Sequence, residues 1–196
     1  MQTHPTLLAL ALALAATTAA SADTLTGHID DPALRRKTQL VYVETAAGTF
    51  APLATPAVMN QTGNTYSPKI LPVLIGSKVE FRSGDPELHN VNARANKTQL
   101  FNQAVLPHQM FTKKMEQKGV VHLSCNIHKE MSADIIVLQN PYFARPDADG
   151  GFTIANVPAG SYSIRIFGSD LSDEQRARVF KISVGHGSPP IKLALK

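Results

Sequence analysis

The stretch Cys125-Asn-Ile-His128-Lys-Glu-Met131 is the part of the sequence that decides the fold. It holds the only cysteine of the chain, then a histidine three residues on and a methionine three residues further. Thiolate, imidazole and thioether groups are the ligands that soft transition metals select. Apolar runs at residues 120–124 and 134–138 flank the stretch, which predicts a loop between two β-strands.

A fourth ligand is available upstream at His89, which stands before Asn90 at a predicted strand end. Two imidazoles and one thiolate in a trigonal set, with a weak axial thioether, suit both oxidation states of copper. The side chains of His89, Cys125, His128 and Met131 therefore predict a site for one copper ion that exchanges one electron. Zinc would accept cysteine and histidine, but its sites usually close without a thioether.

Each ligand candidate also has an ordinary interpretation when it is taken alone. Cys125 could be a small buried core residue, His128 a surface histidine, and Met131 a filler of the core. The three together, on the single cysteine of the chain, favour the metal site.

The remaining histidines and methionines favour simpler roles. His122 lies three residues before Cys125 on the same predicted strand, so its side chain is expected on the opposite face, in solvent. A second soft-metal site at His108, Met110 and Met115 is an alternative, but their spacing matches no known site, and irregular loop residues are the preferred interpretation.

Residues 1–22 have the pattern of a secretory signal peptide. An apolar run at residues 7–16 precedes Ala20-Ser21-Ala22, which predicts cleavage after Ala22. The run is too short for a stable membrane span. We therefore expect residues 23–196 to be periplasmic or secreted, without stable membrane insertion. One exported cysteine cannot form an internal disulfide, which leaves burial, pairing with another chain, or metal binding for its thiol.

The composition restricts other functions. The formal net charge of +4 is mild and predicts no nucleic-acid partner. The sequence has no nucleophile motif with a flanking base and no phosphate-binding glycine loop. A copper site that carries single electrons changes nothing except the oxidation state of the ion, so we expect a protein that is not an enzyme.

The chain after residue 22 is predicted to be all-β, with turn residues such as Gly76-Ser77 and Asp149-Gly150 between short apolar runs. The candidate strands are residues 25–29, 39–43, 70–73, 78–82, 120–124, 134–138, 152–154, 161–167, 179–184 and 191–195. Ser172 and Gln175 form a capping-box pattern that predicts a helical turn over residues 172–178. Many short strands of this kind favour a β-sandwich or a barrel.

On these residues, the chain resembles the cupredoxins, the type 1 blue copper family, over about residues 58–140. Its Cys-x-x-His-x-x-Met loop is similar to that of the amicyanin branch, which is plastocyanin-like. The segment 71–81, then Asp85 and His89-Asn90, resembles the family's strand that leads to the first histidine ligand.

The resemblance implies a Greek-key β-sandwich with His89, Cys125 and His128 as equatorial ligands and Met131 as the axial ligand. It also implies that Asn90 ties the two ligand loops together and brings a backbone donor near the thiolate, a kind of contact that tunes a metal site.

The chain departs from the family at the residue after the loop histidine. Amicyanins have proline there, and this chain has Lys129, followed by Glu130. Many cupredoxins surround that histidine with apolar residues that dock the redox partner. A more polar docking surface is therefore expected here.

The C-terminal residues resemble a different kind of domain. The pattern at residues 146–167, with its repeated turns and alternating apolar residues, is similar to carboxypeptidase-regulatory-like β-sandwiches. We expect residues 23–140 to form the copper-binding domain and residues 141–196 a smaller β portion, with a boundary near Asn140-Pro141. The alternative that residues 23–57 pair with the C-terminal portion stays open. The whole layout resembles secreted cupredoxin-type proteins of the methylamine-utilisation group.

The leading functional hypothesis is a periplasmic type 1 copper protein that carries single electrons between redox partner proteins. The alternative is a copper-binding protein that buffers or delivers the ion without electron transfer. A rigid ligand set argues against delivery, because handing over an ion needs exposed, exchangeable ligands.

Overall fold

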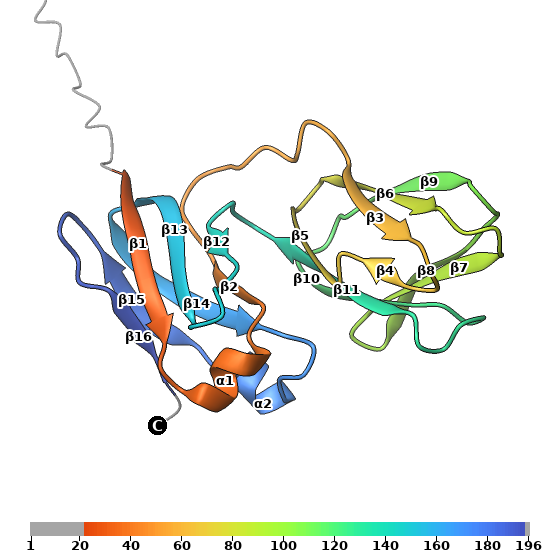
Figure 1. Cartoon of the computed structure of the whole chain (residues 1–196). Helices are drawn as coiled ribbons and strands as arrows, with labels where there is room; N and C mark the ends of the chain where they lie inside the picture. The colour runs from red at the N-terminus through yellow and green to blue at the C-terminus, as the bar shows by residue number, and fades with distance from the viewer. Residues whose placement is uncertain (1–21, 195–196) are drawn as a thin grey trace, which may run out of the picture.

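The structure is a computed structural model, and it describes residues 22–194. Strands make up most of the secondary structure in these residues. They form four sheets, packed in pairs into two β-sandwiches (Figure 1). We call the sandwich built from both ends of the described chain the terminal sandwich, and the one built from the middle the central sandwich. The all-β fold class predicted from the sequence is confirmed.

The central sandwich contains nine consecutive strands. They are β3 (Ala57–Gln61), β4 (Tyr66–Ser67), β5 (Ile70–Leu74), β6 (Lys78–Ser83), β7 (His89–Ala95), β8 (Thr98–Val105), β9 (Met110–Lys114), β10 (Gly119–Ser124) and β11 (Ser132–Leu138). One sheet has the order β5-β11-β10-β7-β8 and the other β4-β3-β6-β9. The chain crosses between these sheets repeatedly, which is typical of a Greek-key sandwich.

The terminal sandwich takes its strands from both ends of the described chain. They are β1 (Ala22–Ile29), β2 (Leu40–Val43), β12 (Phe143–Ala144), β13 (Gly151–Pro158), β14 (Gly160–Phe167), β15 (Phe180–Val184) and β16 (Ile191–Leu193), with helices α1 (Pro32–Lys37) and α2 (Asp173–Ala177). The sheets have the orders β13-β1-β16 and β12-β2-β14-β15. The first two strands thus pair with strands that follow residue 140.

Two connections join the sandwiches. Residues 44–56 run from β2 over to β3, and the end of β11 leads to β12 (Figure 1). A set of buried apolar side chains lies where the sandwiches meet, which we call the interface cluster: Leu40, Ile70, Leu74, Ile136, Leu138 and Phe167.

The position of strand β11 explains why its sequence is continuously apolar. Ile135 and Val137 face the core of the central sandwich, whereas Ile136 and Leu138 belong to the interface cluster. Successive side chains of a strand point to opposite faces, so a strand covered on both faces loses the apolar–polar alternation.

Several elements were not predicted from the sequence. Strands β7, β8 and β9 are rich in asparagine, glutamine and lysine, and most side chains of β8 and β9 are exposed. β8 and β9 are edge strands with mostly exposed faces, and in the interior strand β7 every second residue (Asn90, Asn92 and Arg94) is polar, so these strands give little apolar signal. Helix α1 did carry a sequence signal, because aspartate is a favoured N-cap residue and proline is favoured at the first helical position. In the structure, Asp31 accepts from the backbone N–H groups of Ala33 and Leu34, and Pro32 begins the helix.

The predicted helical turn near residue 172 is confirmed. Helix α2 begins after Ser172, whose hydroxyl accepts from the N–H of Gln175, while the Gln175 side chain accepts from the N–H of Ser172. None of the helices of the described residues is long and apolar enough to cross a membrane. The predicted signal peptide lies almost entirely in residues 1–21, outside the described residues.

Candidate metal centre

The start of β7 and the end of β10 lie side by side. The two strands are antiparallel neighbours, with Ser124 opposite Asn92, so the chain leaves β10 next to the point where it enters β7. His89 is the first residue of β7, and Cys125 directly follows β10. Strand register therefore brings two residues 36 positions apart to the same end of the central sandwich.

Potential ligand atoms of three predicted residues converge there. One atom each of His89, Cys125 and His128 lie within 4.8 Å of one another. The Nδ1 atoms of the two imidazole rings are 3.1 Å apart, and the ring planes differ by 65°. His89 and Cys125 are buried, whereas His128 is half-buried. The group thus has a closed inner side and one histidine toward the surface.

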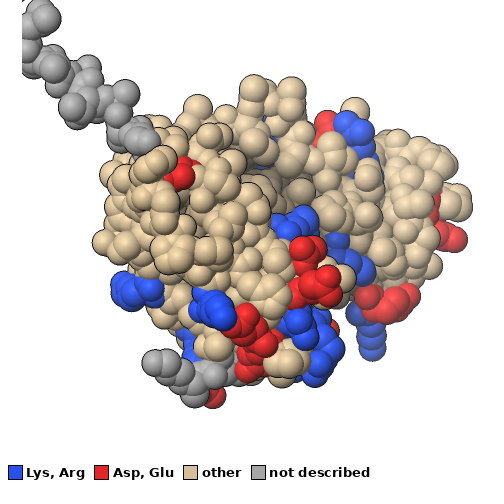
Figure 2. All heavy atoms as spheres, turned by 60° about the vertical axis from the view of Figure 1, so that its left-hand side comes forward, with Lys and Arg blue, Asp and Glu red and all other residues tan. Residues whose placement is uncertain are grey.

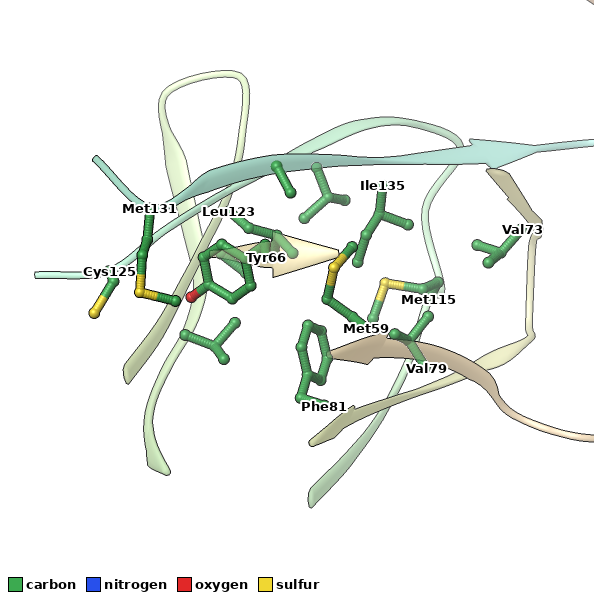
Figure 3. Packing of buried hydrophobic residues seen from close by; sticks show 14 of the residues in the cluster. Met59, Tyr66, Val73, Val79, Phe81, Met115, Leu123, Cys125, Met131 and Ile135 are labelled. Atoms are coloured by element: carbon green, nitrogen blue, oxygen red, sulfur yellow. The ribbon is translucent and has the colours of Figure 1, made fainter. Parts of the chain in front are cut away.

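Met131 lies on the inner side of this group. Its side chain is fully buried, and Figure 3 shows its sulfur and that of Cys125 at the same end of the core. Two backbone hydrogen bonds close the loop, from Met131 N–H to the His128 carbonyl (3.0 Å) and from Cys125 N–H to the Met131 carbonyl (3.2 Å). The loop therefore folds back on itself and returns Met131 beneath Cys125. Its role as fourth ligand stays a prediction.

The donor set fits a copper ion. Two imidazole nitrogens, one thiolate and a thioether are the set that copper accepts in both oxidation states. The described residues also contain a group of oxygen-rich character, formed by Asp85, Glu87 and His89, but it includes the exposed side chain of Glu87. The buried thiol distinguishes the first group as the one for a soft metal.

Asn90 links the two ligand-bearing segments. Its side-chain oxygen accepts a hydrogen bond from the N–H of Asn126, which follows Cys125 (2.6 Å), and its amide nitrogen donates to Asn102 on β8 (2.5 Å). The contact to Asn126 is of the kind that the resemblance implied for Asn90. It holds the loop against β7 at the residue next to the thiol.

Tyr66 was not predicted to matter, yet it lies directly beneath the site. Its buried hydroxyl donates toward the carbonyls of Asn90 (2.8 Å) and Ser124 (3.3 Å), the residues beside His89 and Cys125. Burial, followed by the negative charge of the Cys125 thiolate, raises the pKa of Tyr66 well above its usual range. The phenol is therefore a permanent donor that bridges β7 and β10.

Asp85 is the second residue to which sequence reasoning gave no role. One carboxylate oxygen accepts from the N–H of Gly63 (2.7 Å), and the other accepts from the N–H of Asn64 (3.2 Å) and from Nε2 of His89 (2.8 Å). Burial alone would raise the pKa of Asp85, but these three hydrogen bonds outweigh it and hold the pKa below its usual value. The only local signal was an acidic residue four positions before His89.

His122 lies outside the group, as predicted. Its side chain is 54% exposed, and its Nδ1 lies 3.0 Å from a carboxylate oxygen of Asp134. Of the other predicted loop residues, Met110 instead opens β9 with an exposed side chain, and Met115 is buried in the central core. Met110 and Met115 therefore lie in different surroundings, the first at the surface and the second in the core.

Comparison with solved structures finds partial likenesses. A purple cupredoxin from Nitrosopumilus maritimus is 24% identical, with 41% of this chain and 98% of that chain covered, at a TM-score of 0.38. A reduced amicyanin variant is 18% identical over 50% of this chain and 97% of its own, at a TM-score of 0.39. A copper-containing nitrite reductase from Thermus scotoductus SA-01 is 21% identical over 56% of this chain and 27% of its own, at a TM-score of 0.41.

No protein-family model and no curated protein matches the chain. The arrangement of the central sandwich itself agrees with the predicted fold. The chain crosses repeatedly between its two sheets, and ligand atoms of His89, Cys125 and His128 meet at one end of this sandwich. Strand order and site together give the middle of this chain a cupredoxin-like Greek-key fold.

Proposed function

We propose that the protein is an exported type 1 copper protein that carries single electrons between redox partners. The observation that supports it most is the convergence of the His89, Cys125 and His128 ligand atoms on a buried point, with Met131 beneath. A copper ion bound there would supply one-electron exchange between its two oxidation states. The ligand residues of this set would be His89, Cys125, His128 and Met131.

The residues around the site favour electron transfer over delivery of the ion. His89 and Cys125 are buried at the adjoining ends of paired strands, and Asn90 and Tyr66 cross-link those strands. Ligands held in this way move little when the charge of a bound ion changes, and they exchange poorly with an outside acceptor. A delivery protein would need ligands that open readily to solvent.

The surface near His128 is suited to contact with another protein. Leu88 precedes His89, Leu106 follows the strand residue paired with His89, and Ile127 precedes His128; all three side chains are exposed. Charged Lys129 and Glu130 are exposed beside them. A redox partner would therefore meet apolar contacts from three segments together with one basic and one acidic side chain.

Export is part of the proposal. It rests on the predicted signal peptide at residues 1–22 and on the lone cysteine, which the structure buries. In an oxidising compartment, a buried and metal-bound thiolate avoids the intermolecular disulfides that an exposed thiol would form.

The test is to express the full chain, purify the exported form, and add Cu(II). We expect an intense visible charge-transfer band from the thiolate, which Cys125→Ser abolishes. His122→Ala serves as the matched control, because this histidine lies three residues away and outside the group, and it should keep the band. A colourless, weakly held ion in the unaltered protein would exclude a type 1 site.

A second measurement distinguishes a carrier from a buffer or delivery protein. Reversible voltammetry of the copper-loaded protein, with the copper retained against a competing chelator, is expected for a carrier. Rapid loss of copper to the chelator without a reversible wave would instead favour the buffering alternative.

A further inference from the structure

The carboxylate of Asp85 is enclosed between a tight turn and a candidate ligand. Its side chain is 9% exposed, and that of His89 is fully buried. On one side are the N–H groups of Gly63 and Asn64, in the turn between β3 and β4; on the other is Nε2 of the His89 ring. The turn therefore fixes the carboxylate, and the carboxylate fixes the ring.

Both oxygens of Asp85 act as acceptors in this arrangement. Oδ1 accepts from Gly63, and Oδ2 accepts from both Asn64 and His89. An asparagine would present an NH2 group at one of these positions, where it would face an N–H donor. The site therefore requires a carboxylate, not merely a polar residue of the same size.

The contact determines which nitrogen of His89 is free. An ionised carboxylate has no proton to donate, so Nε2 must carry the hydrogen of the neutral ring. The lone pair is then on Nδ1, the atom that lies 3.1 Å from Nδ1 of His128. His89 and His128 are the two histidines of the group that includes Cys125. Asp85 thus presents the unprotonated nitrogen of His89 to the ligand group.

We propose that Asp85 is a positioning residue of the metal centre: it locks the tautomer and orientation of His89 and lowers the reduction potential of a bound copper ion. The inference rests on the proposed function. A buried negative charge behind one ligand stabilises the more positive oxidation state, and hydrogen bonding to the outer nitrogen makes an imidazole a stronger donor. Both effects favour Cu(II) over Cu(I), which means a lower potential.

The direct test is the midpoint potential of copper-loaded Asp85→Asn. We expect the reduction potential to rise. For a one-electron couple, a tenfold weaker preference for Cu(II) over Cu(I) corresponds to an increase of about 59 mV. Asp134→Asn is the matched control, because Asp134 makes the same kind of contact to His122, outside the ligand group. It should leave the potential unchanged. Equal potentials for Asp85→Asn and the unaltered protein would overturn the proposal.

A measurement without copper and without a variant tests the tautomer. Nitrogen-15 NMR of the histidine rings in the copper-free protein at neutral pH should show His89 protonated at Nε2 and bare at Nδ1. A proton on Nδ1, or rapid exchange between the two forms, would overturn the proposal even if Asp85→Asn does not fold. Absence of the thiolate band would reject the copper function, while the NMR result would still decide the role of Asp85.

Discussion

At the scale of single residues, the candidate metal centre depends on side chains that are not ligands. Asn90, Tyr66 and Asp85 each join segments that are far apart in the chain: the loop after Cys125, the short strand β4, and the turn at Gly63. Each acts through hydrogen bonds to backbone groups or to a ligand ring. Buried polar groups of this kind are costly to leave unpaired, so their removal should be measurable in stability.

Asn90→Ala should destabilise the copper-free protein by about 1–3 kcal/mol, because it leaves the N–H of Asn126 without its acceptor. Asn92→Ala is the control. Asn92 lies on the same strand and contacts the Asn126 side chain at 3.2 Å near the surface, so its loss should cost no more than about 0.5 kcal/mol. Chemical denaturation measures both values, and equal losses would contradict the linking role of Asn90.

Tyr66 should make the protein less stable in alkali. Its pKa is raised in the folded state, whereas the unfolded chain ionises near its ordinary value of about 10. Below pH 10 the phenol is protonated in both states and stability is unaffected; above pH 10 only the unfolded state loses the proton, so the free energy of unfolding falls. The contribution is up to about 1.4 kcal/mol per pH unit.

Urea denaturation between pH 8 and 11 would reveal this dependence. Tyr66→Phe should be less stable at neutral pH but should show a shallower decline above pH 10. Some decline should remain, because burial also raises the pKa of Tyr42. Parallel curves for the two proteins would mean that the Tyr66 phenol ionises as easily in the folded state as in the unfolded one.

At the scale of elements, the loop between β10 and β11 contains a turn at the position where the chain departs from amicyanins. Met131 N–H bonds to the His128 carbonyl, so Lys129 and Glu130 are the central residues of a four-residue turn. Neither has a positive φ angle, which excludes the turn types that need one and fits type I. The first central position of a type I turn favours proline.

Lys129→Pro should therefore stabilise the protein by about 0.4–1 kcal/mol, because it reduces the freedom of the unfolded chain without straining the turn. Glu130→Pro is the matched control and should destabilise it, since proline is disfavoured at the second central position. Thermal unfolding of the two copper-free variants gives the comparison. Destabilisation by both would show that the loop does not hold a type I turn.

Predictability from sequence also differs by element. Strands with apolar faces, such as β6, β10, β11 and β14, were located to within one or two residues. The hairpin of β7 and β8 was not predicted because the outward-facing residues of both strands are polar. The pairing of the two strands, not their composition, makes these residues β-strands. Helix α1 was missed although Asp31-Pro32 is a recognisable helix start.

At the scale of the whole molecule, the two sandwiches share a buried apolar contact. In the interface cluster, Leu40 and Phe167 come from the terminal sandwich, and Ile136 and Leu138 come from β11 of the central sandwich. Polar contacts accompany it, including Arg145 to the Ile70 carbonyl (2.6 Å). Figure 2 shows basic and acidic side chains intermingled on the visible face of the terminal sandwich, with no large area of one sign there.

Neighbouring isoleucines on β11 offer a test of this coupling. Ile135→Ala removes a side chain from the central core and Ile136→Ala one from the interface cluster; each should cost about 2–5 kcal/mol. Only Ile136→Ala should separate the unfolding of the two sandwiches into two calorimetric transitions. A single transition that is almost unshifted in Ile136→Ala would contradict a structural role for the interface.

Copper binding should stabilise the whole protein, because the ligand group exists only in the folded state. At a free copper concentration of about 1,000 times the dissociation constant, the gain is about 4 kcal/mol. Calorimetry of the copper-free and copper-loaded protein measures it, and Cys125→Ser should remove most of the gain. Equal melting temperatures with and without copper would argue against a preformed site.

The sequence alone determined the chemistry of the candidate centre and the class of the fold. Cys125, His128 and Met131 lie within seven residues, so their spacing already states which ligands one loop can offer. Apolar alternation is likewise local. Tertiary structure decided what depends on strand register over long separations: the approach of His89 to that loop, the pairing of β1 with β13, and the enclosure of Asp85 by the Gly63 turn. No short segment contains both partners of those contacts, which form only when the whole chain has folded.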